Sequence, residues 1–355
     1  MPDLMVKSSL RNYEVNFSDS VIESLKKELR TDDVILIDKK VHEHFPGDTI
    51  KMLEGYECIY IDATEDQKSY NALPPIIERL MANQFRKNHR LVAIGGGITQ
   101  DITAFIASIM YRGVEWLFFP TTLLAQADSC IGGKTSINLG KYKNQLGNFY
   151  PPSKIFIIPE FTKSLPLLDF KSGMGEMLHF YLVSGEDDFD YYVKHYEKAF
   201  TDPDVLKSLI RKNLGIKQSI IERDEFDTGE RQLLNYGHSF GHAIETLTGY
   251  AIPHGIAVSY GMDISNFISA KLGFIDEPLR MKIRNVLRKN WEGTHLPVLD
   301  VNEYEKALSH DKKNIGNTYQ VILTRGIGKM FKHGIEPNSQ FSGWLEEYFN
   351  TQVVG

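Results

Sequence analysis

Short apolar segments alternate with amphipathic segments along the first half of the chain. Most of the apolar segments are hydrophobic at every position, and they are rich in Val, Ile, Leu and Phe. Strands of this kind are buried on both faces, as in a parallel sheet that is covered by helices on both sides. The pattern predicts strands over residues 34–37, 58–61, 91–94, 116–119 and 155–158.

The second half of the chain has a different pattern. From about residue 172 onward, apolar positions recur at helical spacing, which predicts helices over 203–225, 229–248, 255–272 and 277–290 and one late strand over 319–323. We therefore expect an α/β N-terminal nucleotide-binding domain with a mostly parallel sheet (1–165) and a mostly α-helical C-terminal domain (166–355). A ligand is expected between them, at the carboxyl ends of the strands.

Composition and charge narrow the class of protein. The chain has 355 residues, of which 42% are hydrophobic and 24% charged, and a net charge of -6. These values are typical of a soluble globular protein and give no reason to expect a nucleic-acid partner. We find no apolar run long enough to span a membrane. The two cysteines, Cys58 and Cys130, form no disulfide framework, which favours the cytoplasm.

A glycine-rich turn follows the predicted strand 91–94. Gly95, Gly96 and Gly97 lead directly into a helical pattern, an arrangement that lets a pyrophosphate approach bare backbone N–H groups at a helix N-terminus. The usual dinucleotide motif has a further glycine where this chain has Gln100. Upstream, Asp38 ends a predicted strand, where it could accept hydrogen bonds from a ribose or cap a helix.

A second glycine-rich segment contains Gly132-Gly-Lys134-Thr. A P-loop would need its first glycine where Asp128 stands, and the residues before the segment read as a helix instead of a strand, so we reject an ATPase. Lys134, together with Lys143 and Asn144, could still bind a phosphate monoester. A solvated basic loop is the alternative.

Histidine and glutamate residues at helical spacing predict a metal site in the second half. His238, His242 and Glu245 are at i, i+4 and i+7, so a helix would place them on one face. A loop with glycine and proline could return His254 to the same face, and imidazole nitrogens are common ligands of Zn²⁺. The spacing leaves His242 and His254 as equal candidates.

A further pair lies upstream of this cluster. Glu176 and His179 are at i and i+3 of a predicted helix and could both face one metal ion. A surface glutamate beside a half-buried histidine is the alternative reading.

Taken in order, these motifs resemble the 3-dehydroquinate synthases and the wider sugar phosphate cyclases from about residue 34 to residue 330. The matching blocks include Gly95-Gly-Gly-Ile-Thr-Gln-Asp101, Pro120-Thr-Thr-Leu-Leu-Ala-Gln-Ala-Asp128, Gly132-Gly-Lys134-Thr and Asn235-Tyr-Gly-His238-Ser-Phe-Gly-His242. The resemblance implies an NAD-binding α/β domain, a helical domain that binds a divalent metal, usually Zn²⁺ with Co²⁺ as an alternative, and a homodimer.

The resemblance also implies roles for individual residues. The metal ligands would be Glu176, His238 and His254, and His242 would be an acid/base group that contacts substrate. Residues at the positions where the family holds NAD are Asp38, Glu65, Lys68, Gly95, Gly96, Gly97, Asp101, Thr121, Thr122, Leu124, Phe161, Ser164 and Leu165. Residues at the substrate positions are Asp128, Lys134, Lys143, Asn144, Lys217, Arg231, Asn235, Arg112 from the partner subunit, and Lys312 or Lys313.

By the same resemblance, the substrate is 3-deoxy-D-arabino-heptulosonate 7-phosphate. NAD removes hydride from an alcohol, phosphate is eliminated, hydride returns, and an intramolecular aldol reaction closes the ring, so NAD is not consumed. Lys217 and Arg231 would hold the substrate carboxylate.

Three positions depart from the family pattern. His179 stands where the family has Lys, Asp227 where it has Glu, and Ile256 where it has Glu. His179 is shorter than Lys and titrates near neutrality, so it does not supply the same permanent charge.

Three alternatives stay open, of which the dehydrogenase rests on a shared two-domain plan and glycine-rich turn and the other two on these departures. One is a cyclase for another sugar phosphate, such as sedoheptulose 7-phosphate or an amino analogue. The others are a metal-dependent polyol dehydrogenase and a protein that binds NAD or sugar phosphate without catalysis.

Overall fold

A computed structural model describes residues 2–140, 142–311, 314 and 316–351 of the chain. The chain forms two compact units. Unit 1 comprises Met1–Pro166 and Ile210–Phe226, and unit 2 comprises Leu167–Leu209 and Asp227–Gly355. The boundary expected from the sequence, near residue 165, put 210–226 in the helical half, whereas the contacts of this segment group it with unit 1.

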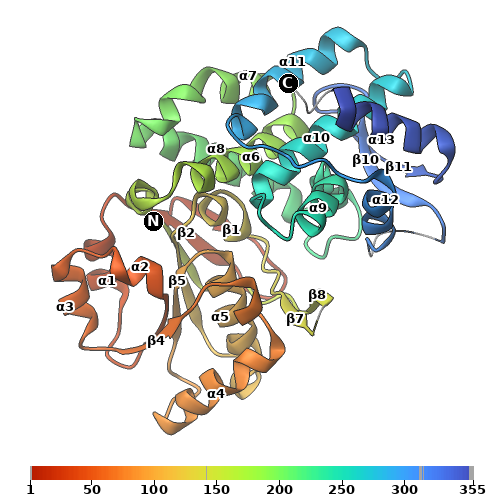
Figure 1. Cartoon of the computed structure of the whole chain (residues 1–355). Helices are drawn as coiled ribbons and strands as arrows, with labels where there is room; N and C mark the ends of the chain where they lie inside the picture. The colour runs from red at the N-terminus through yellow and green to blue at the C-terminus, as the bar shows by residue number, and fades with distance from the viewer. Residues whose placement is uncertain (1, 141, 312–313, 315, 352–355) are drawn as a thin grey trace. The chain divides into compact units, whose positions relative to one another are not determined.

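Unit 1 is built on a seven-stranded sheet (Figure 1). The strand order is β1-β2-β9-β6-β5-β3-β4, and every neighbouring pair is parallel except β1 and β2. The sequence-based prediction of a mostly parallel sheet is therefore confirmed. The strands are β1 (Leu4–Val6), β2 (Tyr13–Phe17), β3 (Val34–Asp38), β4 (Glu57–Ile61), β5 (Leu91–Gly95), β6 (Trp116–Pro120) and β9 (Lys154–Ile157).

Alternate side chains of these strands build the core of unit 1. Ile35 and Ile37 of β3 lie in one cluster with residues at every second position of β5, β6 and the segment from β9 onward, namely Val92, Ile94, Leu117, Phe119, Phe156 and Ile158. This period of two is that of a strand, and both faces are apolar because helices cover both. The helices are α1 (Val21–Glu28), α2 (Lys39–Glu43), α3 (Gly47–Leu53), α4 (Leu73–Ala82) and α5 (Gly97–Ile109).

Unit 2 is mostly helical, as predicted. Its elements are α6 (Leu167–Ser184), α7 (Glu186–His195), α9 (His238–Leu247), α10 (His254–Lys271), α11 (Glu277–Trp291), α12 (Val301–Ser309), α13 (Ser339–Thr351) and the antiparallel pair β10 (Tyr319–Thr324) and β11 (Met330–Ile335), while α8 (Pro203–Ile221) runs from unit 2 into unit 1. The predicted helix over 229–248 is divided: a 3₁₀ turn, η7 (Glu230–Asn235), precedes α9. Gly237, with a positive φ of 81°, separates the two.

The central helix of unit 2 is α10, which packs against α6, α9 and α11. Its residues 255–269 are all buried, so no polar stripe faces water along that stretch. Glycines allow the neighbouring backbones to come close. A Cβ atom on Gly261 would lie 1.9 Å from the carbonyl oxygen of Gly237, and one on Gly255 would lie 1.8 Å from that of Ser172.

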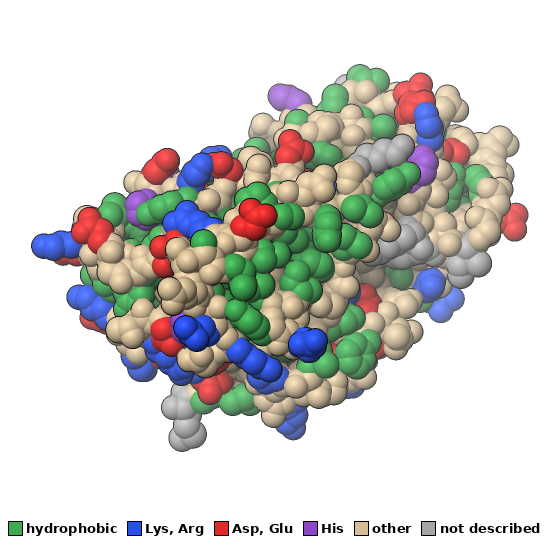
Figure 2. All heavy atoms as spheres, turned by 90° about the horizontal axis from the view of Figure 1, so that it is seen from below, with side chains coloured by type: hydrophobic (Ala, Val, Ile, Leu, Met, Phe, Trp, Pro, Cys, Tyr) green, Lys and Arg blue, Asp and Glu red, His purple; other side chains and the backbone are tan. Residues whose placement is uncertain are grey.

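The surface carries both signs of charge. Figure 2 shows Lys and Arg side chains interspersed with Asp and Glu over the face it presents, around a central area of hydrophobic side chains. Among the described residues, none of the helices combines the length and the apolar character needed to traverse a bilayer.

The close crossing of α9 and α10 leads to a test of the packing. Gly261→Ala should lower the free energy of unfolding by about 1–3 kcal/mol, because the new methyl group meets rigid backbone. Gly343→Ala in α13 is the matched control: nothing lies within 4 Å of its Cβ position, so removing the glycine should stabilise the helix by about 0.5–1 kcal/mol. Urea denaturation measures both, and equal effects of the two substitutions would contradict the packing described.

Candidate metal and cofactor sites

Three helices of unit 2 bring a carboxylate and two imidazoles together. Glu176 lies in the middle of α6, and His238 and His254 are the first residues of α9 and α10. One ligand atom from each of the three lies within 4.8 Å of the other two. The structure therefore brings together the three residues that the resemblance implied as metal ligands, although 62 positions separate Glu176 from His238 in the sequence.

The spacing of these atoms fits a divalent ion. Glu176 Oε1 lies 3.6 Å from His238 Nε2, and Glu176 Oε2 lies 3.6 Å from His254 Nε2. Tetrahedral Zn²⁺ with bonds of about 2.0–2.1 Å separates neighbouring ligands by about 3.4 Å. Glu176 is 2% exposed and its Oε2 has no hydrogen-bond partner among the described residues, which is a costly state for a buried carboxylate unless a cation binds it.

The electrostatics of the group favour an ionised Glu176. Burial alone would raise the pKa of its carboxyl group. The imidazoles of His238, His254 and His179 act in the opposite direction and outweigh burial, so the pKa of Glu176 is below its ordinary value. An ionised carboxylate beside two imidazole Nε2 atoms is a suitable ligand set for Zn²⁺ or Co²⁺.

Two other histidines border this group. His242, on α9, is exposed, and its ring centroid lies 5.6 Å from that of His238. His179, on α6, is 1% exposed, with Nδ1 3.8 Å from Glu176 Oε1 and its ring 5.1 Å from that of His238. Neither belongs to the group of Glu176, His238 and His254 found within the described residues. The sequence-based alternative of a half-buried His179 is wrong, because the side chain is fully enclosed.

In unit 1, the predicted cofactor residues gather at one edge of the sheet. Asp38 ends β3 and Gly95 ends β5, and these two strands are neighbours in the sheet. The chain continues from β3 to β4 on one side and from β5 to β6 on the other side, so the strand order reverses between β3 and β5. Ligands of open parallel sheets bind at such a switch point, outside the carboxyl ends of the strands. Residues from the segments after β6 and β9 come to the same edge, namely Thr121, Thr122, Leu124, Phe161, Ser164 and Leu165.

The glycine turn has the predicted strand–turn–helix form. Gly96 is the N-cap of α5, and a Cβ atom on Gly95 would lie 2.4 Å from Thr99 Oγ1, so a larger residue does not fit there. Backbone N–H groups at this helix N-terminus are available to an anion. Asp38 caps α2 by accepting a hydrogen bond from the Lys40 N–H at 2.9 Å, which confirms the capping alternative.

Glu65, Lys68 and Asp101 form part of one network. Lys68 Nζ lies 2.6 Å from Asp101 Oδ2. Asn138, in β7 (Ile137–Leu139), donates its side-chain amide to Glu65 Oε1 at 2.8 Å and accepts the Asn144 N–H at 2.8 Å. Burial raises the pKa of Glu65, but Asn138 and two lysines lower it further than burial raises it. No role for Asn138 could be predicted from the sequence, because only the fold reveals its partners.

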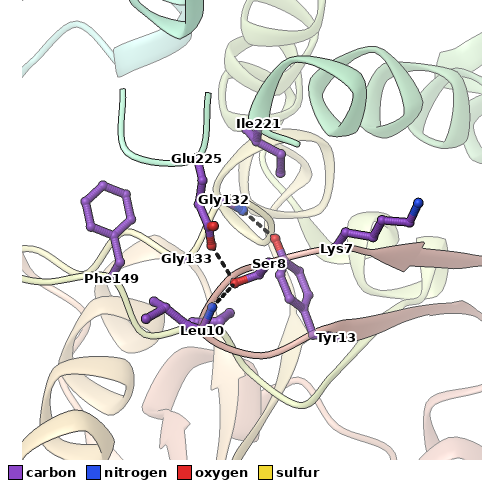
Figure 3. Close-up of a pocket in the computed structure, with 10 residues that line it drawn as sticks. Lys7, Ser8, Leu10, Tyr13, Gly132, Gly133, Phe149, Ile221 and Glu225 are labelled. Carbon is purple, nitrogen blue, oxygen red and sulfur yellow. Dashed lines mark hydrogen bonds between the residues drawn. The ribbon is translucent and has the colours of Figure 1, made fainter. Parts of the chain in front are cut away.

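The loop that contains Lys134 is anchored by a hydrogen bond to a residue of the N-terminal segment. Figure 3 shows Tyr13 of β2 accepting the Gly132 N–H at 2.8 Å, and Ser8 bound to Glu225. The pocket that these residues line is too small for a sugar phosphate. Lys134 itself is exposed, and Lys143, in β8 (Tyr142–Leu146), has Nζ 3.3 Å from Glu65 Oε1. Tyr13 has no motif around it that could have revealed this contact.

Asp128 and Lys217 form an ion pair within unit 1. Lys217 Nζ lies 2.8 Å from Asp128 Oδ1 and also donates to the Asp128 carbonyl oxygen. Lys217 is 6% exposed, so its charge has little access to water. The resemblance placed both residues at substrate positions, and the structure joins them even though 89 positions separate them.

The remaining predicted substrate residues lie elsewhere in the chain. Arg231, in η7, is buried, and Asn235 ends the same turn and donates its side-chain amide to the Gln232 carbonyl oxygen at 3.0 Å. Asp227 precedes η7 with a φ of 60°. Arg112, in unit 1, is exposed. Lys312 and Lys313 lie outside the described residues.

These features define a class of protein that can hold a dinucleotide and a divalent metal. The glycine turn at the switch point of the parallel sheet suits a dinucleotide, and the Glu-His-His group of the helical unit suits a divalent metal. Family models describe the particular branch. The model for the N-terminal part of 3-dehydroquinate synthase matches residues 58–172, and the model for its C-terminal part matches residues 173–314. The chain belongs to the 3-dehydroquinate synthase family.

Comparisons over the full length agree with this assignment. A 3-dehydroquinate synthase of Thermodesulfovibrio yellowstonii is 36% identical over 342 residues, which cover 93% of this chain and 95% of the relative. Among solved structures, a 2-epi-5-epi-valiolone synthase from Streptomyces hygroscopicus with bound NAD⁺ and Zn²⁺ has a TM-score of 0.84 at 24% identity, covering 96% of this chain and 98% of that one. A 2-deoxy-scyllo-inosose synthase with NAD⁺ and Co²⁺ has a TM-score of 0.83 at 22% identity, covering 98% of both chains. At these identities the two structures show a shared fold.

The Glu-His-His group should bind zinc. Glu176→Gln removes the charged ligand and should weaken zinc affinity by more than about 100-fold. Substitution of a residue that only supports a ligand typically weakens metal affinity by about 10–100-fold, so the loss of a ligand should exceed that range. Competition with a chromophoric chelator measures the affinity. Glu346→Gln, which changes an exposed glutamate on α13, is the matched control and should bind zinc as the unmodified protein does. Zinc binding of equal strength by Glu176→Gln would exclude this group as the metal site.

Proposed function

We propose that the protein is an NAD- and metal-dependent sugar phosphate cyclase that converts 3-deoxy-D-arabino-heptulosonate 7-phosphate to 3-dehydroquinate and phosphate. The observation that carries the proposal is the convergence of Glu176, His238 and His254 in a chain that belongs to the 3-dehydroquinate synthase family. The relatives named 3-dehydroquinate synthase match nearly the whole chain, so the proposal does not depend on one domain alone.

Separate groups of residues would bind the metal, bind NAD and transfer a proton. Glu176, His238 and His254 would hold the metal, and the carboxyl edge of the sheet, with Asp38 and the glycine turn, would hold NAD. When bound, the metal polarises a substrate hydroxyl as a Lewis acid and NAD accepts and returns one hydride. His242 would move a proton at the substrate, which its exposure permits.

Positive side chains would bind the two anionic ends of the substrate. Lys134, Lys143 and Asn144 lie in the loop and hairpin of unit 1 that follow Asp128, and they would hold the phosphate. Lys217 and Arg231 would hold the carboxylate. Arg231 is buried, so an anion that reaches its guanidinium meets a charge that water screens only weakly.

Arg112 supports a proposed homodimer. It is exposed, yet Tyr111 and Arg112 both have positive φ, at 50° and 63°, a costly conformation for residues other than glycine. The Tyr111 hydroxyl donates to the Phe85 carbonyl oxygen at 2.8 Å, which keeps the turn in place. We propose that this turn presents Arg112 to the phosphate bound by the partner subunit.

A specific observation favours a second candidate function. His179 occupies the position of a family lysine and is enclosed beside Glu176, so the hydroxyl-binding groups next to the metal differ from those of the family pattern. A cyclase acting on an uncarboxylated sugar such as sedoheptulose 7-phosphate is therefore the alternative.

Phosphate release separates these functions. The protein, loaded with zinc and NAD, should release phosphate from 3-deoxy-D-arabino-heptulosonate 7-phosphate at least about tenfold faster than from sedoheptulose 7-phosphate, because a charge-assisted hydrogen bond from the buried Arg231 to the carboxylate contributes more than about 1.4 kcal/mol. The absorbance of NADH should stay flat at steady state, since hydride returns to the substrate. Turnover of the uncarboxylated sugar alone would support the second function, and NADH rising in step with product would identify a dehydrogenase.

The carboxylate contact can be tested separately. Arg231→Gln should lower kcat/KM for the carboxylated substrate by about 10–100-fold, the loss of one charge-assisted hydrogen bond of about 1.5–3 kcal/mol. Arg288→Gln, at an exposed arginine of α11, is the control and should keep the kcat/KM of the unmodified protein. A thermal melt checks that both variants fold. An unchanged kcat/KM in Arg231→Gln would remove Arg231 from the binding site.

A further inference from the structure

Glu245 lies beside one of the three metal-ligand residues. Its Oε2 atom is 3.1 Å from Nδ1 of His254, and its side chain is only 14% exposed. The other nitrogen of the same ring, Nε2, lies 3.6 Å from Glu176 Oε2. The His254 ring therefore has a different carboxylate at each of its two nitrogens.

The loop between α9 and α10 holds this arrangement in place. The Tyr250 N–H donates to the Glu245 carbonyl oxygen at 2.8 Å, and Gly249 and Tyr250 both have positive φ, at 57° and 65°. These turn residues follow the end of α9 at Leu247, and the chain then leads into α10, whose first residue is His254. Glu245 and His254 are thus brought together by a short turn within one unit.

The chemistry of imidazole gives this contact a consequence. A neutral imidazole carries a proton on one nitrogen and a lone pair on the other. When Nδ1–H is donated to Glu245, the lone pair is on Nε2, the atom that faces Glu176 and a bound metal. The negative charge of the acceptor also makes the ring a stronger ligand.

The same residues offer a competing explanation. His242, Glu245 and His254 also have ligand atoms within 4.8 Å of one another, as a second metal site would require. In that site, Nδ1 of His254 would have to give its lone pair to an ion instead of a proton to Glu245. The 3.1 Å separation is a hydrogen-bond distance and is shorter than the roughly 3.4 Å between neighbouring ligands of tetrahedral zinc, which favours the hydrogen bond.

We propose that Glu245 is a positioning residue for the metal site, which fixes the tautomer and orientation of His254 through the hydrogen bond to Nδ1. This inference rests on the proposed function only in that Glu176, His238 and His254 bind the metal. It gives a role to the carboxylate that sequence spacing had placed on the same helix face as His238 and His242.

Two substitutions at Glu245 distinguish the effect of its hydrogen-bond acceptor from the effect of its negative charge. Glu245→Ala removes both and should weaken zinc affinity by about 10–100-fold. Glu245→Gln keeps an acceptor oxygen but not the charge, so its affinity should lie between those of Glu245→Ala and the unmodified protein. Chelator competition on the full chain measures the affinities, and the visible spectrum of bound Co²⁺ should change in Glu245→Ala as His254 is freed to turn.

Controls separate this role from a purely structural one. The thermal melt of each metal-free variant is recorded, because a structural residue would lower stability without the graded order of affinities. Zinc affinity of Glu245→Ala equal to that of the unmodified protein overturns the proposal. So does a stoichiometry of two tightly bound zinc ions that falls to one in Glu245→Ala, since Glu245 would then be a ligand of a second ion.

The variant Glu176→Gln shows which claim has failed. If Glu176→Gln loses zinc while Glu245→Ala keeps it, the metal site stands and only the role of Glu245 is wrong. If Glu176→Gln keeps zinc, the proposed metal site itself is wrong.

Discussion

The arrangement of unit 2 depends on one buried carboxylate. Glu176 is enclosed in α6, and burying its negative charge costs several kcal/mol unless a cation compensates for it. The imidazoles of His238 and His254 are close enough to do so in part, and a divalent ion between them would complete the compensation. The middle of α6 and the first turns of α9 and α10 must then stay within a few ångströms of the position that the ion would occupy. Close backbone contacts at Gly255 and Gly261 make that possible, because a side chain at either position would force the helices apart.

Much of the fold could be predicted from the sequence because its patterns are strong. The central strands are apolar throughout, and a parallel sheet covered on both faces is the arrangement that such strands adopt. The strands β1 and β2 escaped prediction because β1 has only 3 residues and β2 contains Glu14 and Asn16 between its apolar residues. The hairpin of β7 and β8 escaped for a similar reason, since β7 has only 3 residues and β8 is mostly polar with no buried residue.

The site was predictable only where the chemistry repeats a known pattern. Periodicity placed His238, His242 and Glu245 on one helix face, but it could not rank His242 against His254, which depends on the path of the loop between α9 and α10. The structure puts His254 beside Glu176 and Glu245 behind His254. Asn138 and Tyr13 could not be found in this way, because their partners, Glu65 and Gly132, are 73 and 119 positions away along the chain.

A shared fold does not decide the substrate, because synthases with different names have the fold of this chain, so the substrate has to be inferred from individual side chains. In the proposed function, Lys217 and Arg231 would hold the carboxylate of the substrate, and His179 lies enclosed beside Glu176. Because His179 is enclosed, it would act on the substrate through the space and hydrogen bonds around the metal ligands. Substrate choice and metal geometry would then be coupled.

The most direct test of the central claim is anomalous diffraction from crystals of the protein soaked with zinc. The account predicts one strong peak at about 2.0–2.2 Å from a carboxylate oxygen of Glu176 and from Nε2 of both His238 and His254. A peak bound by His242 and Glu245 without Glu176, or no peak near Glu176 at saturating zinc, would contradict it.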